Sequence, residues 1–143
     1  MLDKYRHIHF IGIGGAGMSA LAYVLVKRGF DVTGSDLQAG HMAYELAEAG
    51  ALVYMGHDEC QIEGAEAVVV STAIPKTNPE LVAARANNIP VLHRSDVLMA
   101  LLNGTGTKGV AWAGAHGKTT TSAMIGVIAA EAGIDPTVVI GTT

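Results

Sequence analysis

The chain has 143 residues, half of them apolar, a formal net charge of −4 and one cysteine, Cys60. This length suits one domain and the start of a second, the acidic balance argues against binding to nucleic acid, and the lone cysteine excludes an intrachain disulfide and favours a reducing compartment. No signal peptide is visible and the apolar runs end well short of the roughly 18 residues that span a membrane, so we expect a cytoplasmic protein without membrane insertion.

Short apolar runs alternate with helical patterns along the chain. The pattern predicts strands over residues 8–11, 31–34, 51–54, 67–71 and 90–92, separated by helices over 16–27, 42–49, 79–87 and 96–102. The run at 67–71 is continuous and β-branched, which is typical of a strand covered on both faces of a parallel sheet. Alternation of this kind predicts βαβ units, so we expect an α/β fold with a Rossmann-like, doubly wound parallel sheet.

A polar, glycine-rich segment at 103–108 predicts a domain boundary, which divides the chain into residues 1–105 and 106–143. Beyond it the pattern predicts a strand over 109–113, a helix over 118–132 and a strand over 137–140, as at the start of a second α/β domain. Only 23 residues (121–143) follow Thr120, too few for the rest of a nucleotide-hydrolysing domain. We therefore expect the sequence to be the front part of a longer enzyme.

The first glycine loop runs from Gly12 to Gly17, directly after the first predicted strand. Gly12 allows a tight turn, Gly14 lets the backbone approach a diphosphate, and Gly17 lets the helix pack closely on the strand. The acidic residue expected about 20 positions further on is Asp36, which follows the second strand. NAD, FAD and nucleotide sugars all suit this geometry, so the loop alone does not name its ligand.

The second glycine loop reads Gly-Ala-His-Gly-Lys-Thr-Thr over residues 114–120, and Trp112 stands where a Walker A motif has its first glycine. In such a loop the backbone N–H groups cradle phosphates, the lysine reaches the β and γ oxygens, and a hydroxyl holds Mg²⁺. Lys118 and Thr119 take these positions. His116 is either a nucleotide contact or a spacer. The residues predicted to bind ATP are Gly114, Ala115, His116, Gly117, Lys118, Thr119 and Thr120.

Together the two loops resemble the Mur ligase family, the ATP-dependent amide-bond-forming enzymes of bacterial peptidoglycan synthesis. The resemblance is carried by residues 8–19, 32–36, 68–74 and 113–121, in order along the chain. The first loop is most similar to that of members that add L-alanine, since members acting on a recycled tripeptide usually carry a cysteine and a bulkier residue there. Ala115 departs from the threonine that is usual in the family, and a small residue should fit.

The resemblance implies that UDP-N-acetylmuramate binds to the first domain and ATP with Mg²⁺ to the second loop. ATP then phosphorylates the substrate carboxylate, the amine of L-alanine attacks the acyl phosphate, and Lys118 is the catalytic residue that stabilises charge on the transferring phosphoryl group. Thr119 is the implied metal ligand. The implied contacts with the UDP-sugar are Gly12, Gly14, Gly15, Ala16, Gly17, Met18, Asp36, Ser71, Thr72, Ala73, Ile74, His93 and Arg94.

The resemblance also implies that further metal ligands, a modified lysine and the L-alanine site lie outside this chain, so we expect the chain alone to be inactive. Two alternatives remain open. A nicotinamide-dependent dehydrogenase domain agrees with the first loop and Asp36, although the second loop argues against it. A nucleotide-sensing module without enzymatic activity agrees with the short length. The sequence does not predict an oligomeric state.

Overall fold

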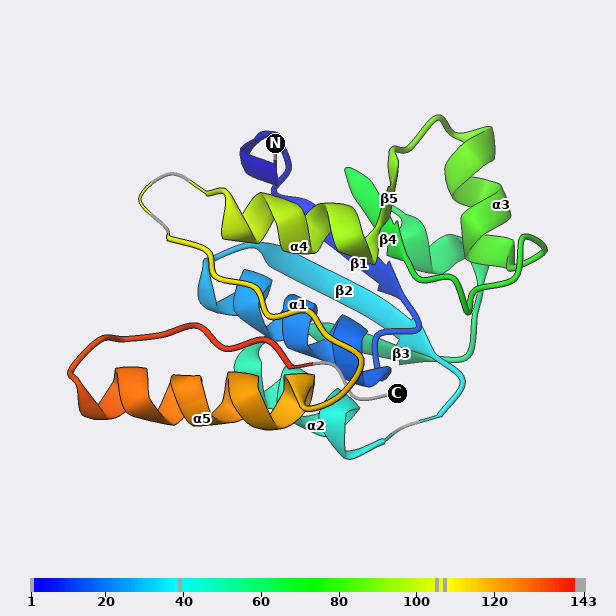
Figure 1. Ribbon diagram of the computed structural model, residues 1–143. Coiled ribbons are helices and arrows are strands. Elements are labelled where there is room, and N and C mark those ends of the chain that lie inside the picture. Colours follow the sequence, from blue (N-terminus) through cyan, green and yellow to red (C-terminus); the bar gives the residue numbers. More distant parts are fainter. Residues whose placement is uncertain (1, 39, 105, 107, 141–143) are drawn as a thin grey trace.

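The computed structural model describes residues 2–38, 40–104, 106 and 108–140. Five parallel strands form one sheet in the order β3-β2-β1-β4-β5 (Figure 1). The strands are His7–Ile11 (β1), Asp31–Asp36 (β2), Leu52–Met55 (β3), Ala67–Val70 (β4) and Val91–His93 (β5). The direction of winding reverses between β1 and β4, where ligands of doubly wound sheets bind. The predicted fold class is confirmed.

Helices cover both faces of this sheet. α1 (Ala16–Lys27), α2 (His41–Ala49) and α4 (Arg94–Leu102) lie on one face, and α3 (Pro79–Ala86) lies on the other with the 3₁₀ turn η2 (Glu59–Ile62). A second 3₁₀ turn, η1 (Leu2–Lys4), precedes β1. The sequence did not predict the two 3₁₀ turns. Every predicted strand and helix up to residue 102 is present, with ends that differ by at most two residues.

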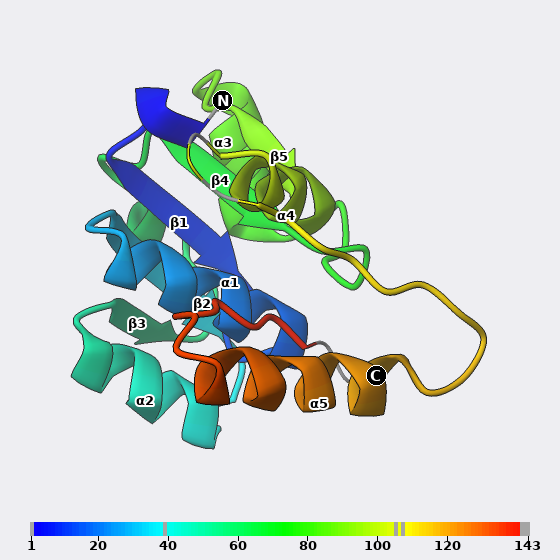
Figure 2. The same cartoon turned by 60° about the vertical axis from the view of Figure 1, so that its left-hand side comes forward.

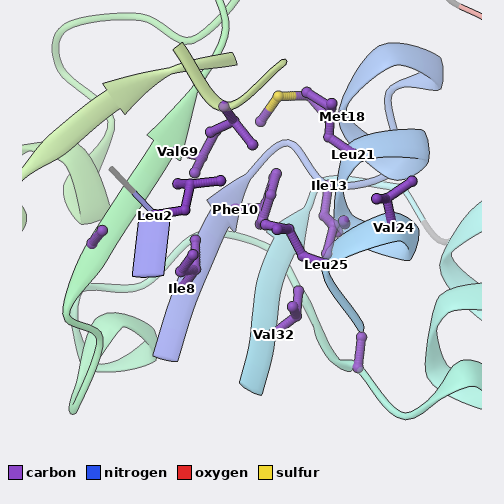
Figure 3. Close-up of a cluster of buried hydrophobic side chains, with 14 of the residues drawn as sticks. Leu2, Ile8, Phe10, Ile13, Met18, Leu21, Val24, Leu25, Val32 and Val69 are labelled. Atoms are coloured by element: carbon purple, nitrogen blue, oxygen red, sulfur yellow. The ribbon is translucent and has the colours of Figure 1, made fainter. Parts of the chain in front are cut away.

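The main core lies between α1 and the sheet. Ile8 and Phe10 of β1 point toward Leu21 and Leu25 of α1, and all four side chains are buried (Figure 3). Residues at alternate positions of a strand face the same side of the sheet, so His9 faces the opposite side, toward α3. This alternation gives β1 an apolar face and a face that carries a buried polar group.

Residues beyond 106 differ from the prediction. The helix is present as α5 (Lys118–Glu131), but the strands predicted over 109–113 and 137–140 are wrong, because these residues have no regular secondary structure. A strand forms only where a neighbouring strand pairs its N–H and C=O groups, and the five-stranded sheet includes neither segment. The predicted domain boundary falls at Thr105, which lies outside the described residues.

The segment at 137–140 packs against helices instead. Val138 contacts Gly126 of α5, where a Cβ would come within 2.8 Å of its Cγ2, and it also lines an open groove between α1 and α2 with Tyr23 and Met42. α5 lies beside α1 and α2 in both views (Figure 1 and Figure 2). Val138 therefore links α5 to the pair of helices α1 and α2.

Candidate functional site: two glycine loops

The first glycine loop is fastened to the end of β2. The N–H groups of Gly12 and Ile13 donate to the carbonyl oxygen of Ser35 at 2.8 and 3.0 Å. The N–H of Gly14 donates to Oδ2 of Asp36 at 2.8 Å. Gly12 has a φ of +79°, a conformation in which glycine has no steric cost. Three successive amides of the loop are thus held by two successive residues of one strand.

The start of α1 offers an unoccupied set of amide donors. Its N-cap, Gly15, has no side chain to cap the helix, and the N–H groups of Ala16 and Gly17 find no acceptor among the residues that the structure describes. Such amides and the positive end of the helix dipole favour an anion. The loop is therefore suited to a phosphate group.

Arg94 brings a positive charge to the same place. It is the first residue of α4, and its guanidinium lies over the first turn of α1, since a Cβ added to Gly17 would come within 2.4 Å of Nη1. Guanidinium groups bind phosphate through paired N–H donors. The structure thus places Arg94 beside the free amides of the first loop.

His93 precedes Arg94 and caps α4. Its Nδ1 accepts from the N–H of Ser95 at 3.3 Å, and its own N–H donates to Oδ2 of Asp96 at 2.9 Å. This capping box starts the helix two residues before the predicted position. Nε2 of His93 is buried and has no hydrogen-bond partner among the described residues. One ring nitrogen therefore caps the helix and the other is available to a ligand.

The segment from Ser71 to Ile74 borders the loop, whereas Met18 does not face it. Ile74 lies against Gly12, with Cδ1 3.0 Å from the position of a Cβ there. The hydroxyl of Ser71 accepts weakly from the N–H of Ala73 at 3.4 Å, and Thr72 and Ala73 are exposed. The side chain of Met18 is buried in the core, and its N–H donates to Gly15. Only the backbone of Met18 belongs to the loop.

Replacing Gly17 by alanine tests the position of Arg94. The new methyl group meets the far end of a flexible side chain, so we expect the guanidinium to move away while the melting temperature changes by less than a few degrees. The affinity for a diphosphate ligand is expected to fall by about tenfold. Thermal unfolding and calorimetric titration with uridine diphosphate measure both effects. A variant that binds as tightly as the original chain would show that Arg94 does not contact the ligand.

The second glycine loop is open to solvent. Gly117, with a φ of +76°, precedes α5, and no side chain caps that helix. The N–H groups at 118–120 have no acceptor within the described part of the chain. The ammonium group of Lys118 folds back over the loop and donates to the carbonyl oxygen of Gly114 at 2.6 Å. This arrangement places a cation and free amides at one helix end, as a phosphate chain requires.

The remaining residues of the second loop are all exposed. Ala115, His116, Thr119 and Thr120 are exposed, and no side-chain hydrogen bond joins the last three of them to the described residues. No group of three or more His, Cys, Asp or Glu side chains in the described ranges could hold a metal ion. A metal at Thr119 would therefore need most of its ligands from a bound molecule.

A buried polar cluster, which the sequence pattern did not predict, lies behind the first loop. Glu80 of α3 is fully buried, and its Oε2 accepts from the hydroxyl of Ser35 at 2.6 Å and from Nδ1 of His57 at 3.0 Å. Nε2 of His9 lies 3.4 Å from Oε1. The only signal in the sequence is a polar residue at every second position of two strands, His7 and His9 in one, Thr33 and Ser35 in the other.

The cluster stabilises the charged form of Glu80. Burial acts to raise the pKa of this carboxyl group, but the polar contacts with His9 and Ser35, and the electrostatic effect of His9 and His57, outweigh burial and hold the pKa below its usual value. A buried carboxylate is tolerated only where donors surround it. Glu80 is therefore expected to be ionised in the folded chain.

The lowered pKa of Glu80 predicts a loss of stability in acid. Its contribution is fully present above the ordinary value of 4.5 and disappears as the pH falls through the lower pKa of the folded chain. Urea unfolding at pH 7 and at pH 3 should show that Glu80→Gln costs clearly less at the lower pH. Below pH 4.5 the unfolded chain gains a proton at Glu80 that the folded chain binds less readily, which reduces the stability that the ionised carboxylate supplies. An equal cost at both pH values would contradict an ionised Glu80.

None of the helices in the described ranges combines the length and the apolar character that crossing a membrane requires.

The sequence matches the family description "Mur ligase family, catalytic domain" over residues 7–105. The UDP-N-acetylmuramate–L-alanine ligase of Symbiobacterium thermophilum is 54% identical over 139 residues, which is 96% of this chain and 28% of that protein. The ligase of the same name from Persephonella marina is 49% identical over 138 residues, which is 96% of this chain and 30% of that protein. This chain thus spans less than a third of the length of these relatives.

Solved structures agree with the sequence comparison. A crystal structure of the UDP-N-acetylmuramate–alanine ligase of Thermotoga maritima has a TM-score of 0.83 and 32% identity, covering 88% of this chain and 29% of that chain. A murein peptide ligase from Psychrobacter arcticus also has a TM-score of 0.83, with 30% identity over 91% of this chain and 27% of that chain. Because the family match spans the first glycine loop and the whole five-stranded sheet, this chain belongs to the Mur ligase family.

Proposed function

We propose that this chain is the nucleotide-binding part of an ATP-dependent ligase that joins L-alanine to UDP-N-acetylmuramate in peptidoglycan synthesis. The observation that carries the proposal is the pair of glycine loops, each opening a helix without a side-chain cap. One loop suits a diphosphate and the other a triphosphate, as a reaction with two nucleotide substrates requires. The names of the relatives supply the substrates.

The first loop and the strand ends around it are proposed to bind the UDP-sugar. Its diphosphate would lie on the amides of Ala16 and Gly17, opposite the guanidinium of Arg94. Asp36 would contact the uridine. Because Nδ1 of His93 accepts from Ser95, Nε2 carries the proton and would donate to the ligand, which would give this buried atom a partner. The other proposed contacts are Gly12, Gly14, Gly15 and Met18 through the backbone, and Ser71, Thr72, Ala73 and Ile74 along the sugar.

The second loop is proposed to bind ATP. The phosphate chain would lie on the amides that open α5, and Lys118 would exchange the carbonyl of Gly114 for a phosphate oxygen. Preorganised positive charge at this point stabilises the charge that develops on the transferring phosphoryl group. Ala115, His116, Gly117 and Thr120 complete the loop around the phosphates.

The residues present fit a magnesium ion. Mg²⁺ keeps several waters and takes one or two protein ligands together with substrate phosphates, and Thr119 offers one exposed hydroxyl beside the free amides of α5. Thr119 would hold the ion, which when bound neutralises charge on the phosphate oxygens. No further protein ligand is needed at this loop for that role.

We propose that the two sites belong to two domains, residues 1–105 and 106–143. We propose no binding site for L-alanine among the described residues. This chain alone is therefore not expected to catalyse the ligation. A cytoplasmic location stays a prediction.

Calorimetric titration of the chain with UDP-N-acetylmuramate and, separately, with NADH tests the proposal. We expect saturable one-to-one binding of the UDP-sugar and no heat of binding with NADH. Binding of NADH without binding of UDP-N-acetylmuramate would instead support a dehydrogenase domain. Uridine diphosphate and UDP-N-acetylglucosamine serve as controls, since weaker binding of both would show that the chain recognises the lactyl carboxylate of the sugar.

A further inference from the structure

The buried cluster around Glu80 connects three segments that border the first glycine loop. Glu80 stands at the start of α3, whose first turn is capped by the side chain of Asn78. Its carboxylate contacts Ser35, at the end of β2, and His57, in the turn that follows β3. Gln61 is the third partner of the carboxylate. When the oxygen and nitrogen of its side-chain amide are exchanged, Nε2 donates to Oε1 of Glu80 at 2.6 Å. One carboxylate thus fixes two turns against one helix.

The directions of the hydrogen bonds follow from the number of protons. The hydroxyl of Ser35 lies 2.6 Å from Oε2 of Glu80, so its single proton goes to the carboxylate. Nδ1 of His57 lies 2.9 Å from that hydroxyl oxygen and 3.0 Å from Oε2, so it must be a donor to both. Nδ1 therefore carries a proton.

Ser35 also holds the glycine loop through its backbone. Its carbonyl oxygen accepts the N–H groups of both Gly12 and Ile13, while the next residue, Asp36, accepts the N–H of Gly14. The carbonyl oxygen of Asp36 in turn accepts the N–H of Gly56, next to His57. The position of β2's last two residues therefore decides where the loop amides point.

We propose that Glu80 is a positioning residue for the diphosphate site: through Ser35 and His57 it fixes the end of β2, and through the carbonyl of Ser35 it presets the glycine loop for its ligand. This inference rests on the proposed function for the identity of the ligand, a UDP-sugar. Buried charged groups seldom add stability beyond what apolar packing provides. Their effect here is to restrict the loop to one conformation before the ligand arrives, which reduces the entropy lost on binding.

Amide hydrogen exchange in the ligand-free chain tests the proposal without any ligand. We expect Ser35→Ala and Glu80→Gln to speed exchange at Gly12 and Ile13 by about tenfold, as the loss of one buried hydrogen bond predicts, while amides of β4 exchange as before. Glu63→Gln is the matched control, since that carboxylate is exposed and directly follows the neighbouring turn η2. Unchanged exchange at Gly12 and Ile13 in a folded Ser35→Ala chain would overturn the proposal.

Titration with UDP-N-acetylmuramate then separates positioning from general stability. His57→Asn keeps an N–H donor near the place of Nδ1, whereas His57→Leu removes it. We expect His57→Asn to bind within about twofold of the original chain and His57→Leu to bind about tenfold more weakly, even where both lower the melting temperature equally. Equal affinities for these two variants would also overturn the proposal.

The two experiments distinguish failure of the proposed function from failure of the positioning role of Glu80. If the original chain does not bind UDP-N-acetylmuramate, the proposed function fails, and the exchange rates still decide whether Glu80 positions the loop. If Glu80→Gln does not fold, Ser35→Ala carries the exchange experiment, because it removes one hydroxyl and leaves the carboxylate with His57 and Gln61.

Discussion

Replacing Gly34 by alanine is expected to lower the free energy of unfolding by about 3 kcal/mol, as overpacking of a buried site does. A Cβ at this position would lie 2.5 Å from Cδ1 of Ile13 and 2.8 Å from the carbonyl oxygen of Phe10. The side chain of Ile13 is itself buried, and the carbonyl belongs to β1 at the centre of the sheet. Neither can move without displacing a strand or the glycine loop. Urea unfolding followed by circular dichroism measures the loss.

Gly40→Ala is the matched control for Gly34→Ala. Gly40 precedes α2 with a φ of −80°, and a Cβ there meets nothing within 4 Å. We expect a loss of about 1 kcal/mol at most, since alanine is a poorer N-cap than glycine but meets no neighbour here. If both variants lost the same stability, the cost would belong to the loss of glycine in general and not to the contact with Ile13.

Replacing Lys118 by alanine is expected to weaken the binding of Mg-ATP by about thirtyfold, which corresponds to about 2 kcal/mol. The ammonium group already lies over the second loop, held by the carbonyl of Gly114, so ATP gains a charged donor without the cost of ordering a long side chain. Alanine removes the donor and the charge together. Titration of the chain with Mg-ATP measures the change.

Two comparisons make the result for Lys118 specific. Lys108→Ala removes an exposed lysine ahead of the second loop and is expected to leave the affinity for Mg-ATP within about twofold, since exposed charges contribute little. The affinity of Lys118→Ala for UDP-N-acetylmuramate should also stay unchanged, because no hydrogen bond joins Lys118 to the first loop within the described ranges. A parallel loss of both ligands would contradict two independent sites.

The sequence predicted the sheet well because parallel strands covered on both faces are continuous apolar runs. The predicted strand ended at Gly34, two residues before the end of β2, because Ser35 and Asp36 are polar. In the structure both residues continue the strand, with Ser35 paired to Ile11 and Asp36 to Met55. Polarity marked the end of the apolar run, whereas the strand ends where its backbone partners end.

The interior of the candidate site could not be predicted in the same way. The spacing of glycines located both loops, but the position of Arg94 over Gly17 depends on where α4 starts, and His93 is an unusual cap that a sequence pattern does not indicate. Glu80 resembles an ordinary residue of a helix's first turn. Only the packing of α3 against η2 and the sheet shows that its carboxylate is buried among Ser35, His9 and His57.

Residues 108–140 show a different limit of prediction from sequence. The predicted strands over 109–113 and 137–140 have the apolar composition of strands, but composition does not supply a neighbour with which to pair. The helix between them forms regardless, because its hydrogen bonds lie within the segment. Helices can therefore be predicted for a short segment more safely than strands can.

The carboxylate of Asp36 and the guanidinium of Arg94 make the charge around the first glycine loop asymmetric, negative at one end and positive at the other. Asp36 already occupies the amide of Gly14 and, through Oδ1, the amide of Gln38 at 3.1 Å, so negative charge is repelled from that end of the loop and attracted to the end near Gly17. A molecule that is anionic at one end and rich in hydroxyl groups at the other fits in one orientation only. Inorganic diphosphate, charged throughout, would leave Asp36 facing a like charge and is expected to compete poorly for this loop.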